Sequence, residues 1–221
     1  MHDGGWVQRK PYPHTYPLMP PWVSAMAQGE GASLLVRVAA ETGVDRYAEA
    51  AASALRLIGV HSSEGGASAE LDGLRLPEEY PTDPPSFVLN GAIFALWGLR
   101  DVAVALADAE VESRFASGAD ALAATIERWD TGAWSRYDLY PHPVVNVASR
   151  AYHGLHVAQL EAMDMLAPRP ALRAAADRFA GYAASPRRRA AALARKALFR
   201  VAEPRSPRVA RVLPWARRAA G

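Results

Sequence analysis

The residues best suited to proton chemistry lie in one short, acidic segment that prolines stiffen. The segment reads Glu78-Glu79-Tyr80-Pro81-Thr82-Asp83-Pro84-Pro85. Proline restricts its own backbone and that of the preceding residue, so this loop can hold a side chain rigidly without regular secondary structure. Phenols and carboxylates can both transfer protons, and functional side chains often lie on such loops. The alternative is structural: Tyr80 anchors the loop by burial, and Glu79 is a solvated carboxylate.

A second set of candidate residues lies nearer the C-terminus. Tyr137 is flanked by Trp134 and Leu139, which suit a core residue as well as a functional one. Tyr152 is followed by His153 and His156, whose i, i+3 spacing places both imidazoles on one side of a predicted helix. Two histidines so spaced can bind a metal, but no third ligand recurs nearby. We therefore expect hydrogen bonding and no metal site.

Helices are the elements that must position these residues. Apolar residues recur at helical spacing in stretches that begin near residues 22, 45, 86, 109 and 148, and again beyond 168. Asp45 and Ser86 are expected to cap their helices, and residues 67–76 alternate in the manner of a short β-hairpin. Helix pairs joined by polar loops predict a mainly α fold, an α/α toroid (incomplete α/α barrel) with a short β-hairpin or loop insertions.

The composition narrows the class of protein. The chain has 221 residues, 50% of them hydrophobic, enough for one domain with a core. It has no cysteine, which excludes disulfides, thiolate catalysis and Cys-based zinc sites. Short apolar runs predict no membrane span, and the N-terminus has no signal-peptide pattern, so a cytoplasmic location is the default expectation. The absence of P-loop, GxGxxG and HExxH patterns disfavours nucleotide and zincin chemistry.

Charge is divided unevenly along the chain. Residues 168–221 hold 14 Lys and Arg against 2 Asp and Glu, whereas residues 1–167 hold 11 against 21. We therefore predict an extended lead-in over 1–21, a helical domain over 22–167 and a basic, Ala- and Arg-rich helical tail over 168–221. The tail is either a solvated helical surface or a contact for an anionic polysaccharide, a membrane face, nucleic acid or an acidic partner.

Five segments, in order and at similar spacing, resemble the C-terminal catalytic domain of D-glucuronyl C5-epimerases. They are Gly4-Gly5-Trp6 with Arg9-Lys10; Trp22 with 24–29 and 33–37; 78–82 with 85–91; Asp130-Thr131-Gly132 with Tyr137-Asp138-Leu139; and Tyr152-His153 with His156 and Gln159-Leu160. Together they cover roughly residues 4–166. The resemblance implies an α/α toroid and an isomerase that converts D-glucuronate to L-iduronate within a heparosan- or heparan-like chain, without a redox cofactor.

Inversion at C5 requires a proton to leave one face of the sugar ring and another to arrive on the opposite face. Two proton-transfer groups are therefore needed, together with donors or cations that stabilise an enolate-like intermediate. The resemblance places Glu79 and Tyr80 on one side of the sugar and Tyr152 on the other. It makes Tyr137 a third tyrosine that holds or polarises the substrate.

The candidate substrate-binding residues carry amides, hydroxyls or imidazoles. Gln28, Ser86 and Asn90 are candidates for contacts with sugar hydroxyls, although Ser86 serves equally well as a helix cap. His153 and His156 are candidates for hydrogen bonds to the substrate. The resemblance implies an anionic, glucuronate-containing polysaccharide as the partner and no nucleic acid. A homodimer, and a glycosyltransferase bound through the basic tail, are further hypotheses.

One motif departs from the family pattern. Tyr-Asp-Leu is usually followed by Arg-His, whereas this chain continues Tyr140-Pro141-His142. The expected arginine would pair with a substrate carboxylate or sulfate. Arg150 and Arg136 are the candidate replacements, although Arg150 is displaced one position from the family's other arginine, a rotation of about 100° on a helix.

Two other functions fit parts of the pattern. A uronate polysaccharide lyase begins with the same C5 proton abstraction, but it also protonates the departing C4 oxygen and leaves an unsaturated product. A non-catalytic domain that binds acidic glycans would explain the basic tail and the altered arginines. The tyrosines within extended motifs favour the epimerase.

Overall fold

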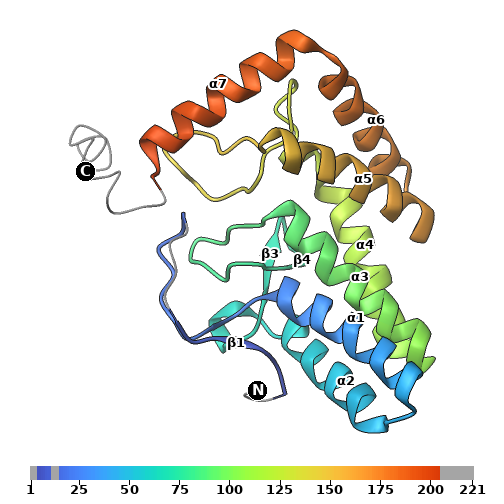
Figure 1. Cartoon of the computed structure of the whole chain (residues 1–221). Helices are drawn as coiled ribbons and strands as arrows, with labels where there is room; N and C mark the ends of the chain where they lie inside the picture. The colour runs from blue at the N-terminus through green and yellow to red at the C-terminus, as the bar shows by residue number, and fades with distance from the viewer. Residues whose placement is uncertain (1–3, 11–14, 205–221) are drawn as a thin grey trace.

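The structure is a computed structural model that describes residues 4–10 and 15–204. Seven α-helices dominate this described part of the chain, as Figure 1 shows. They are α1 (Ala25–Thr42), α2 (Asp45–Gly59), α3 (Leu89–Leu106), α4 (Ala109–Thr125), α5 (Arg150–Leu166), α6 (Pro170–Ala184) and α7 (Pro186–Ala202). The predicted mainly α class is confirmed. The toroidal arrangement of the helices stays a prediction.

The strands of the described residues form two short antiparallel pairs. β1 (Val7–Gln8) pairs with β2 (Trp22–Val23) and ties the lead-in to the segment before α1. β3 (Ser68–Leu71) and β4 (Leu74–Pro77) form the predicted hairpin. Two 3₁₀ turns, η1 (Ser62–Glu64) and η2 (Ile126–Trp129), complete the regular elements. The connections 78–88 and 130–149 have no helix, and both run along the same side of the molecule in Figure 1.

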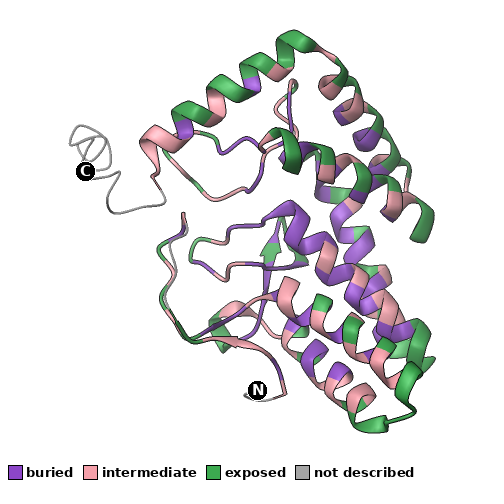
Figure 2. Ribbon diagram, in the orientation of Figure 1, coloured by how far each residue is buried: buried purple, intermediate pink, exposed green. Residues whose placement is uncertain are grey.

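Helix α3 lies at the centre of the core. It packs against α1, α2, α4 and α5, and Figure 2 shows that most of it is buried. Gly29 of α1 and Gly98 of α3 allow a close approach, because a Cβ on Gly98 would lie 2.3 Å from Gly29 Cα. Contrary to the sequence prediction, α3 is long and apolar enough to span a membrane. Since 61% of that stretch is buried inside the protein, a position in the core accounts for its composition.

The two C-terminal helices differ in burial. Helix α6 packs on α4 and α5 and contributes Leu172 and Phe179 to the main core. Of the α7 side chains, Ala192 and Phe199 are buried, and Figure 2 shows that much of this helix is exposed. In the predicted tail, α6 and α7 are helical as far as Ala202, and residues 205–221 lie outside the described part of the chain. The domain boundary at residue 168 stays a prediction, because these contacts do not test it.

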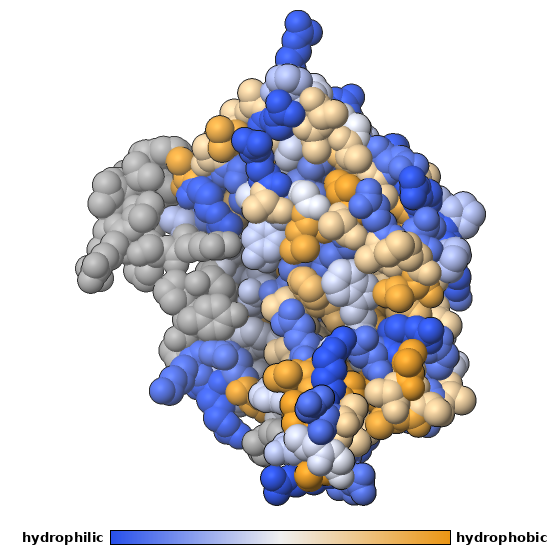
Figure 3. Space-filling model, turned by 45° about the vertical axis from the view of Figure 1, so that its right-hand side comes forward, coloured by the Kyte–Doolittle hydropathy of each residue, from blue (hydrophilic) through white to orange (hydrophobic). Residues whose placement is uncertain are grey.

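Exposed apolar side chains are scattered over the surface. Leu34, Val104 and Met165 lie on three different helices and are 61%, 63% and 79% exposed. Figure 3 likewise shows hydrophobic side chains interspersed with hydrophilic ones on the face that it presents. Scattered exposed apolar residues are normal for a folded protein, so they indicate no particular partner.

Two predictions of helix N-caps are wrong. Asp45 lies in the first turn of α2, after the N-cap residue Val44. Helix α3 begins at Leu89 with Val88 as its N-cap, so Ser86 lies outside the helix and does not cap it. In both cases the polar residue is close to the helix start. The N-cap residue itself, however, is a valine with extended backbone, and its side chain makes no capping hydrogen bond.

Candidate active site

Glu78 organises the loop that carries the best candidate residues. Its buried carboxylate accepts hydrogen bonds from Ser86 N at 3.2 Å, Ser86 Oγ at 2.7 Å and Phe87 N at 2.6 Å. Phe87 has a positive φ of 45°, a costly conformation, and Trp129 Nε1 donates to its carbonyl oxygen at 2.9 Å. Ser86 has no exposed surface. It fixes this loop, which argues against its predicted contact with a sugar hydroxyl.

Glu79, the next residue, is buried in a different way. Its side chain packs on Gly91 in the first turn of α3, where a Cβ would lie 2.3 Å from Glu79 Oε2. It shares a side-chain hydrogen bond with Tyr80, whereas Oε2 has no hydrogen-bond partner among the described residues. Burial raises the pKa of Glu79 to about 7, against the lowering effect of that bond. Glu79 is thus a carboxyl group able to change protonation near neutral pH.

Tyr80 extends from this loop into an aromatic cluster. Its ring centroid lies 4.7 Å from that of Tyr16 and 5.6 Å from that of Trp22. Together with Glu79, Tyr80 borders a cleft of about 340 Å³, a volume within the usual range of small-molecule sites. The other lining residues come from the lead-in and the start of α1: Trp6, Val7, Gln8, Trp22, Ser24, Met26 and Ala27.

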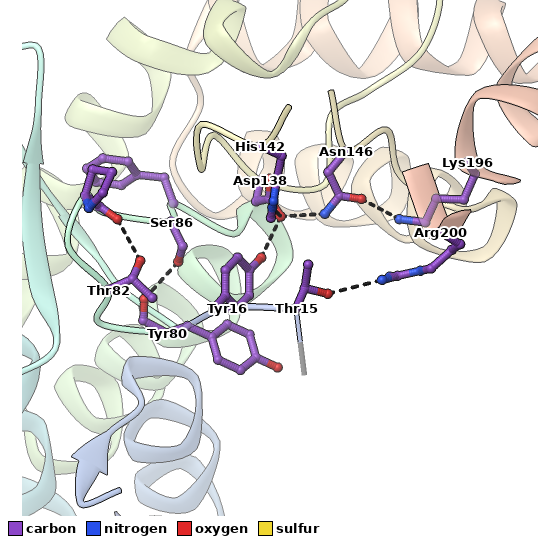
Figure 4. Close-up of polar contacts among 12 residues, drawn as sticks. Thr15, Tyr16, Tyr80, Thr82, Ser86, Asp138, His142, Asn146, Lys196 and Arg200 are labelled. Atoms are coloured by element: carbon purple, nitrogen blue, oxygen red, sulfur yellow. Dashed lines mark hydrogen bonds and ion pairs between the residues drawn. The ribbon is translucent and has the colours of Figure 1, made fainter. Parts of the chain in front are cut away.

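Behind Tyr80 runs a polar network that the sequence did not predict. The Tyr16 hydroxyl donates to Asp138 Oδ2 at 2.6 Å, and Asn146 Nδ2 donates to the same oxygen at 2.5 Å. Lys196 Nζ then donates to Asn146 Oδ1 at 2.6 Å, as Figure 4 shows. His142 Nε2 lies 3.4 Å from Asp138 Oδ2. Burial and the Asp138 carboxylate raise the pKa of Tyr16 well above its usual value, so its phenol remains a donor.

Tyr137 links this network to Tyr152. Tyr137 directly precedes Asp138 and is buried, and it belongs to the same apolar cluster as Tyr16. Its ring meets that of Tyr152 edge to face, with centroids 5.0 Å apart. Tyr152 lies in the first turn of α5 and is 38% exposed, so solvent and solutes can reach it. The predicted tyrosines Tyr80, Tyr137 and Tyr152 are therefore brought together, through Tyr16, from three separate segments.

The two histidines lie in the protein interior. His153 stacks on Trp134 with ring centroids 3.7 Å apart, and its Nε2 lies 2.9 Å from the Phe179 carbonyl oxygen. Ser135 Oγ bridges the pair, 2.7 Å from His153 Nδ1 and 2.9 Å from His156 Nδ1. Burial lowers the pKa of His153 and lowers that of His156 to about 3, so both imidazoles are neutral at pH 7. Neither imidazole is exposed, which argues against their predicted substrate contacts.

The two amide candidates differ. Gln28 has no exposed surface; its Oε1 accepts from Trp6 N and its Nε2 donates to Trp6 O, both at 2.8 Å. It fastens the lead-in to α1, which argues against its predicted sugar contact. Asn90 is almost buried in the first turn of α3, and Gln159 Nε2 donates to its main-chain oxygen at 3.2 Å. Its Oδ1 has no hydrogen-bond partner within the described ranges, and its substrate contact stays a prediction.

The two candidate arginines also differ in environment. Arg136 is half-buried, and burial lowers its pKa; the Asp138 carboxylate opposes this lowering, and Arg128 adds to it. Arg150 is exposed at the first position of α5. Among the described residues no group of three potential metal ligands occurs. The site is thus made of phenols, buried carboxyl groups and nearby cations.

In this mainly helical protein, three tyrosines lie near a buried carboxyl group. Such an arrangement is an acid–base site suited to proton transfer at carbon. Residues 2–181 match the family described as D-glucuronyl C5-epimerase C-terminus, and the chain therefore belongs to this family. It is 35% identical over 199 residues to a D-glucuronyl C5-epimerase of Caenorhabditis elegans. That alignment covers 81% of this chain and 32% of the relative, so the chain spans about a third of that protein's length.

Proposed function

We propose that this chain catalyses C5 epimerisation of D-glucuronate residues in an anionic polysaccharide. The observation that carries the proposal is the Glu79–Tyr80 pair: a hydroxyl beside a carboxyl group whose pKa is about 7, at the edge of a cleft. Family membership supports the reaction, and the name of the C. elegans relative supports glucuronate as the sugar. No step of this reaction needs a redox change, because one C–H bond is broken and one is made.

On one side of the sugar, Glu79 and Tyr80 act as a proton relay. An isolated phenol has a pKa near ~10 and is a poor base at pH 7. The adjacent Glu79 carboxylate can take the phenol proton as the phenol oxygen takes the C5 proton, and can return it in the reverse direction. A pKa near the working pH favours both directions of such a transfer. Burial of Glu79 on Gly91 keeps water away from the carboxyl group and sustains that pKa.

On the opposite side, Tyr152 delivers or removes the second proton. Its partial exposure makes the phenol reachable by a polymer, and its edge-to-face contact with Tyr137 restricts the ring. Tyr137 is held by main-chain bonds, since its N–H donates to Asn146 O at 2.7 Å and its carbonyl accepts from Leu89 N at 3.2 Å. Tyr137 is therefore a rigid support that orients Tyr152 and the sugar.

Aromatic residues of the cleft supply the apolar surface that a sugar ring needs. Trp6 and Trp22 line the same cleft as Tyr80, and Trp6 also packs on Gly31 of α1. Rings of this size bury a large area, and the tryptophan N–H adds a polar contact. We propose that the glucuronate residue or its neighbour in the chain lies against these rings. The homodimer, the glycosyltransferase partner and the cytoplasmic location stay further proposals.

The test is incubation of the chain with a desulfated, glucuronate-containing polymer in deuterated water, followed by NMR at C5. Deuterium at C5 together with iduronate signals is the expected result. An unsaturated uronate product would move the activity to a lyase. Absence of exchange would contradict the proposal, and binding of the polymer without exchange would favour the glycan-binding alternative.

A further inference from the structure

A cation is needed close to the proton-transfer groups of a uronate epimerase. The substrate carboxylate is bonded directly to C5, and removal of the C5 proton adds a second negative charge to the same group of atoms. A fixed positive charge next to that carboxylate stabilises the intermediate more than the ground state. This requirement rests on the proposed function, and it restricts the search to cations adjacent to Tyr80, Tyr137 or Tyr152.

The two arginines predicted for this role are placed less well for it. Arg150 precedes Tyr152 by two residues on α5, and side chains at i and i+2 of a helix do not face each other. Arg136 precedes Tyr137 in a segment that forms an isolated antiparallel bridge with Val147. Neighbouring side chains of such extended backbone point to opposite sides.

Lys196 of α7 is adjacent to the tyrosines. Its Nζ lies 5.4 Å from the centre of the Tyr137 ring and 2.6 Å from Asn146 Oδ1. Asn146 in turn bonds to Asp138, which accepts the Tyr16 hydroxyl, so the ammonium lies at one end of the network in Figure 4. A cation over a tyrosine face is attracted by the ring, which helps to hold the ammonium near Tyr137.

The pattern of α7 explains why Lys196 is turned toward the site. Ala192 and Phe199, the buried residues of this helix, lie four positions before and three positions after Lys196. Residues at these spacings share one helix face. Ala192 belongs to the same apolar cluster as Tyr137, so that face of α7 covers the tyrosines. Arg187, nine positions before Lys196 and exposed, lies about 180° around the helix from Lys196.

We propose that Lys196 binds the C5 carboxylate of the substrate and stabilises the charge that develops there. An ammonium carries three donors on a flexible stem, so one can bond to Asn146 while the charge acts on the carboxylate. Lys196 is thus a substrate-binding residue contributed by a helix that lies beyond residues 2–181, the part of the chain that matches the family. Under this proposal, Lys196 of the basic tail belongs to the active site.

A thermodynamic cycle separates this role from a merely structural one. The affinities of the wild type and Lys196→Gln are measured for a glucuronate-containing oligosaccharide and for the same oligosaccharide with its carboxyl groups reduced to alcohols. In Lys196→Gln, the glutamine amide keeps an N–H donor for Asn146 but has no positive charge, on a side chain one atom shorter than lysine. We expect the wild type to prefer the carboxylate form by about ten- to a hundredfold, the range for a hydrogen bond to a charged group. Lys196→Gln should lose this preference, whereas Arg187→Gln, the control on the opposite, exposed side of α7, should retain it.

Binding is measured without turnover, so the result does not depend on epimerisation. Equal weakening of both ligands in Lys196→Gln would show that Lys196 only supports the loop and would overturn the proposal. A wild type that does not distinguish the two ligands, or a variant that still does, would also overturn it. Loss of the preference in Lys196→Gln without deuterium exchange in the wild type would contradict the epimerase function alone. Lys196→Arg should restore most of the preference, because it restores the charge.

Discussion

Two groups of polar side chains lie against the same connection, residues 130–149, and they differ in protonation. The tyrosine site consists of Glu79, Tyr80, Tyr137 and Tyr152, and the histidine pair consists of His153 and His156. In the histidine pair, His153 and His156 share Ser135 Oγ, and burial lowers both pKa values away from neutral pH. In the tyrosine site, burial moves the pKa of Glu79 in the opposite direction, up to about 7. Desolvation favours the neutral form in both cases. Only the carboxyl group is left with a pKa at which it can exchange protons in neutral solution.

The two regions also differ in access. The histidines are covered by Trp134 and Phe179. Tyr152 is partly exposed, and Tyr80 borders a cleft. Adjacent residues of one helix, Tyr152 and His153, therefore serve different purposes, because one faces the surface and the other the interior. A motif containing both residues does not by itself distinguish a catalytic group from a structural one.

The largest expected effect comes from removing either phenol of the tyrosine site. Tyr80→Phe and Tyr152→Phe should each lower the rate of C5 inversion by about 10²- to 10⁴-fold, the usual contribution of a general acid or base. The aromatic ring remains, so the contacts with Tyr16 and Tyr137 should persist. The rate is measured by NMR in deuterated water, and the thermal unfolding midpoint serves as the folding control. A rate within tenfold of wild type in either variant would remove that tyrosine from the mechanism.

The next effect contrasts the two adjacent carboxyl groups. Glu79→Gln should lower the rate by about a hundredfold or more, because the relay loses its acceptor, while the protein stays folded. Glu78→Gln should instead destabilise the protein by about 1–3 kcal/mol, because a carboxylate that accepts from Ser86 and Phe87 is replaced by a group with one acceptor oxygen. Activity assays and urea unfolding of both variants test the contrast. A reversed pattern, with Glu78 needed for chemistry and Glu79 for stability, would exchange their assigned roles.

The pH dependence of stability is the third expected effect. Glu78 and Glu79 each have a folded-state pKa near 7, above the ordinary value of 4.5, so the folded state holds their protons more tightly than the unfolded state. Their contribution is fully present below pH 4.5 and is lost as the pH rises to about 7. Each carboxyl group contributes on the order of 3 kcal/mol over that window. The free energy of unfolding in urea should fall across this pH range, and it should fall less in Glu79→Gln than in the wild type. The same pH profile in the variant and the wild type would contradict the pKa shift assigned to Glu79.

The smallest expected effect on activity belongs to the histidine pair. His153→Gln should cost about 1–3 kcal/mol of stability, because the bonds to Ser135 and the Phe179 carbonyl are disturbed in the interior. The rate of the folded fraction should stay within about threefold of wild type, since surface access is unchanged. Thermal unfolding and the exchange assay, performed below the unfolding midpoint, measure the two quantities. A large loss of rate without loss of stability would give His153 a functional role.

Local sequence patterns predicted the elements better than they predicted the site. The alternation over 67–76 predicted the hairpin, and helical spacing predicted the helices, because both depend on neighbours within a few residues. The motifs identified Tyr80, Tyr137 and Tyr152, which the structure brings together. Patterns of this kind cannot show whether a polar side chain faces inward, and for that reason Ser86 and Gln28 were assigned to the substrate instead of to loop and lead-in contacts.

The missing part of the site depends on contacts that are distant in sequence. Tyr16 and Asp138 are 122 residues apart, and Lys196 lies 50 residues beyond Asn146. Asp138 belongs to the Tyr-Asp-Leu motif, so a signal for it was present, whereas Tyr16 was one aromatic residue in a proline-rich lead-in. Charge counting predicted a basic tail but could not show that Ala192 and Phe199 orient its single lysine toward Tyr137. Tertiary packing decides which of the tail's basic residues meets the site.

The most direct test of the central claim, proton transfer from two sides, is C5 hydrogen exchange in Tyr80→Phe and Tyr152→Phe with each epimer as substrate. Glucuronate polymer and iduronate polymer are incubated separately in deuterated water, and deuterium and configuration at C5 are read by NMR. We predict that neither variant inverts C5 at an appreciable rate and that each retains exchange on one epimer, with the retained epimer opposite in the two variants. Inversion that persists in either variant, or retention of the same epimer in both, would contradict the account.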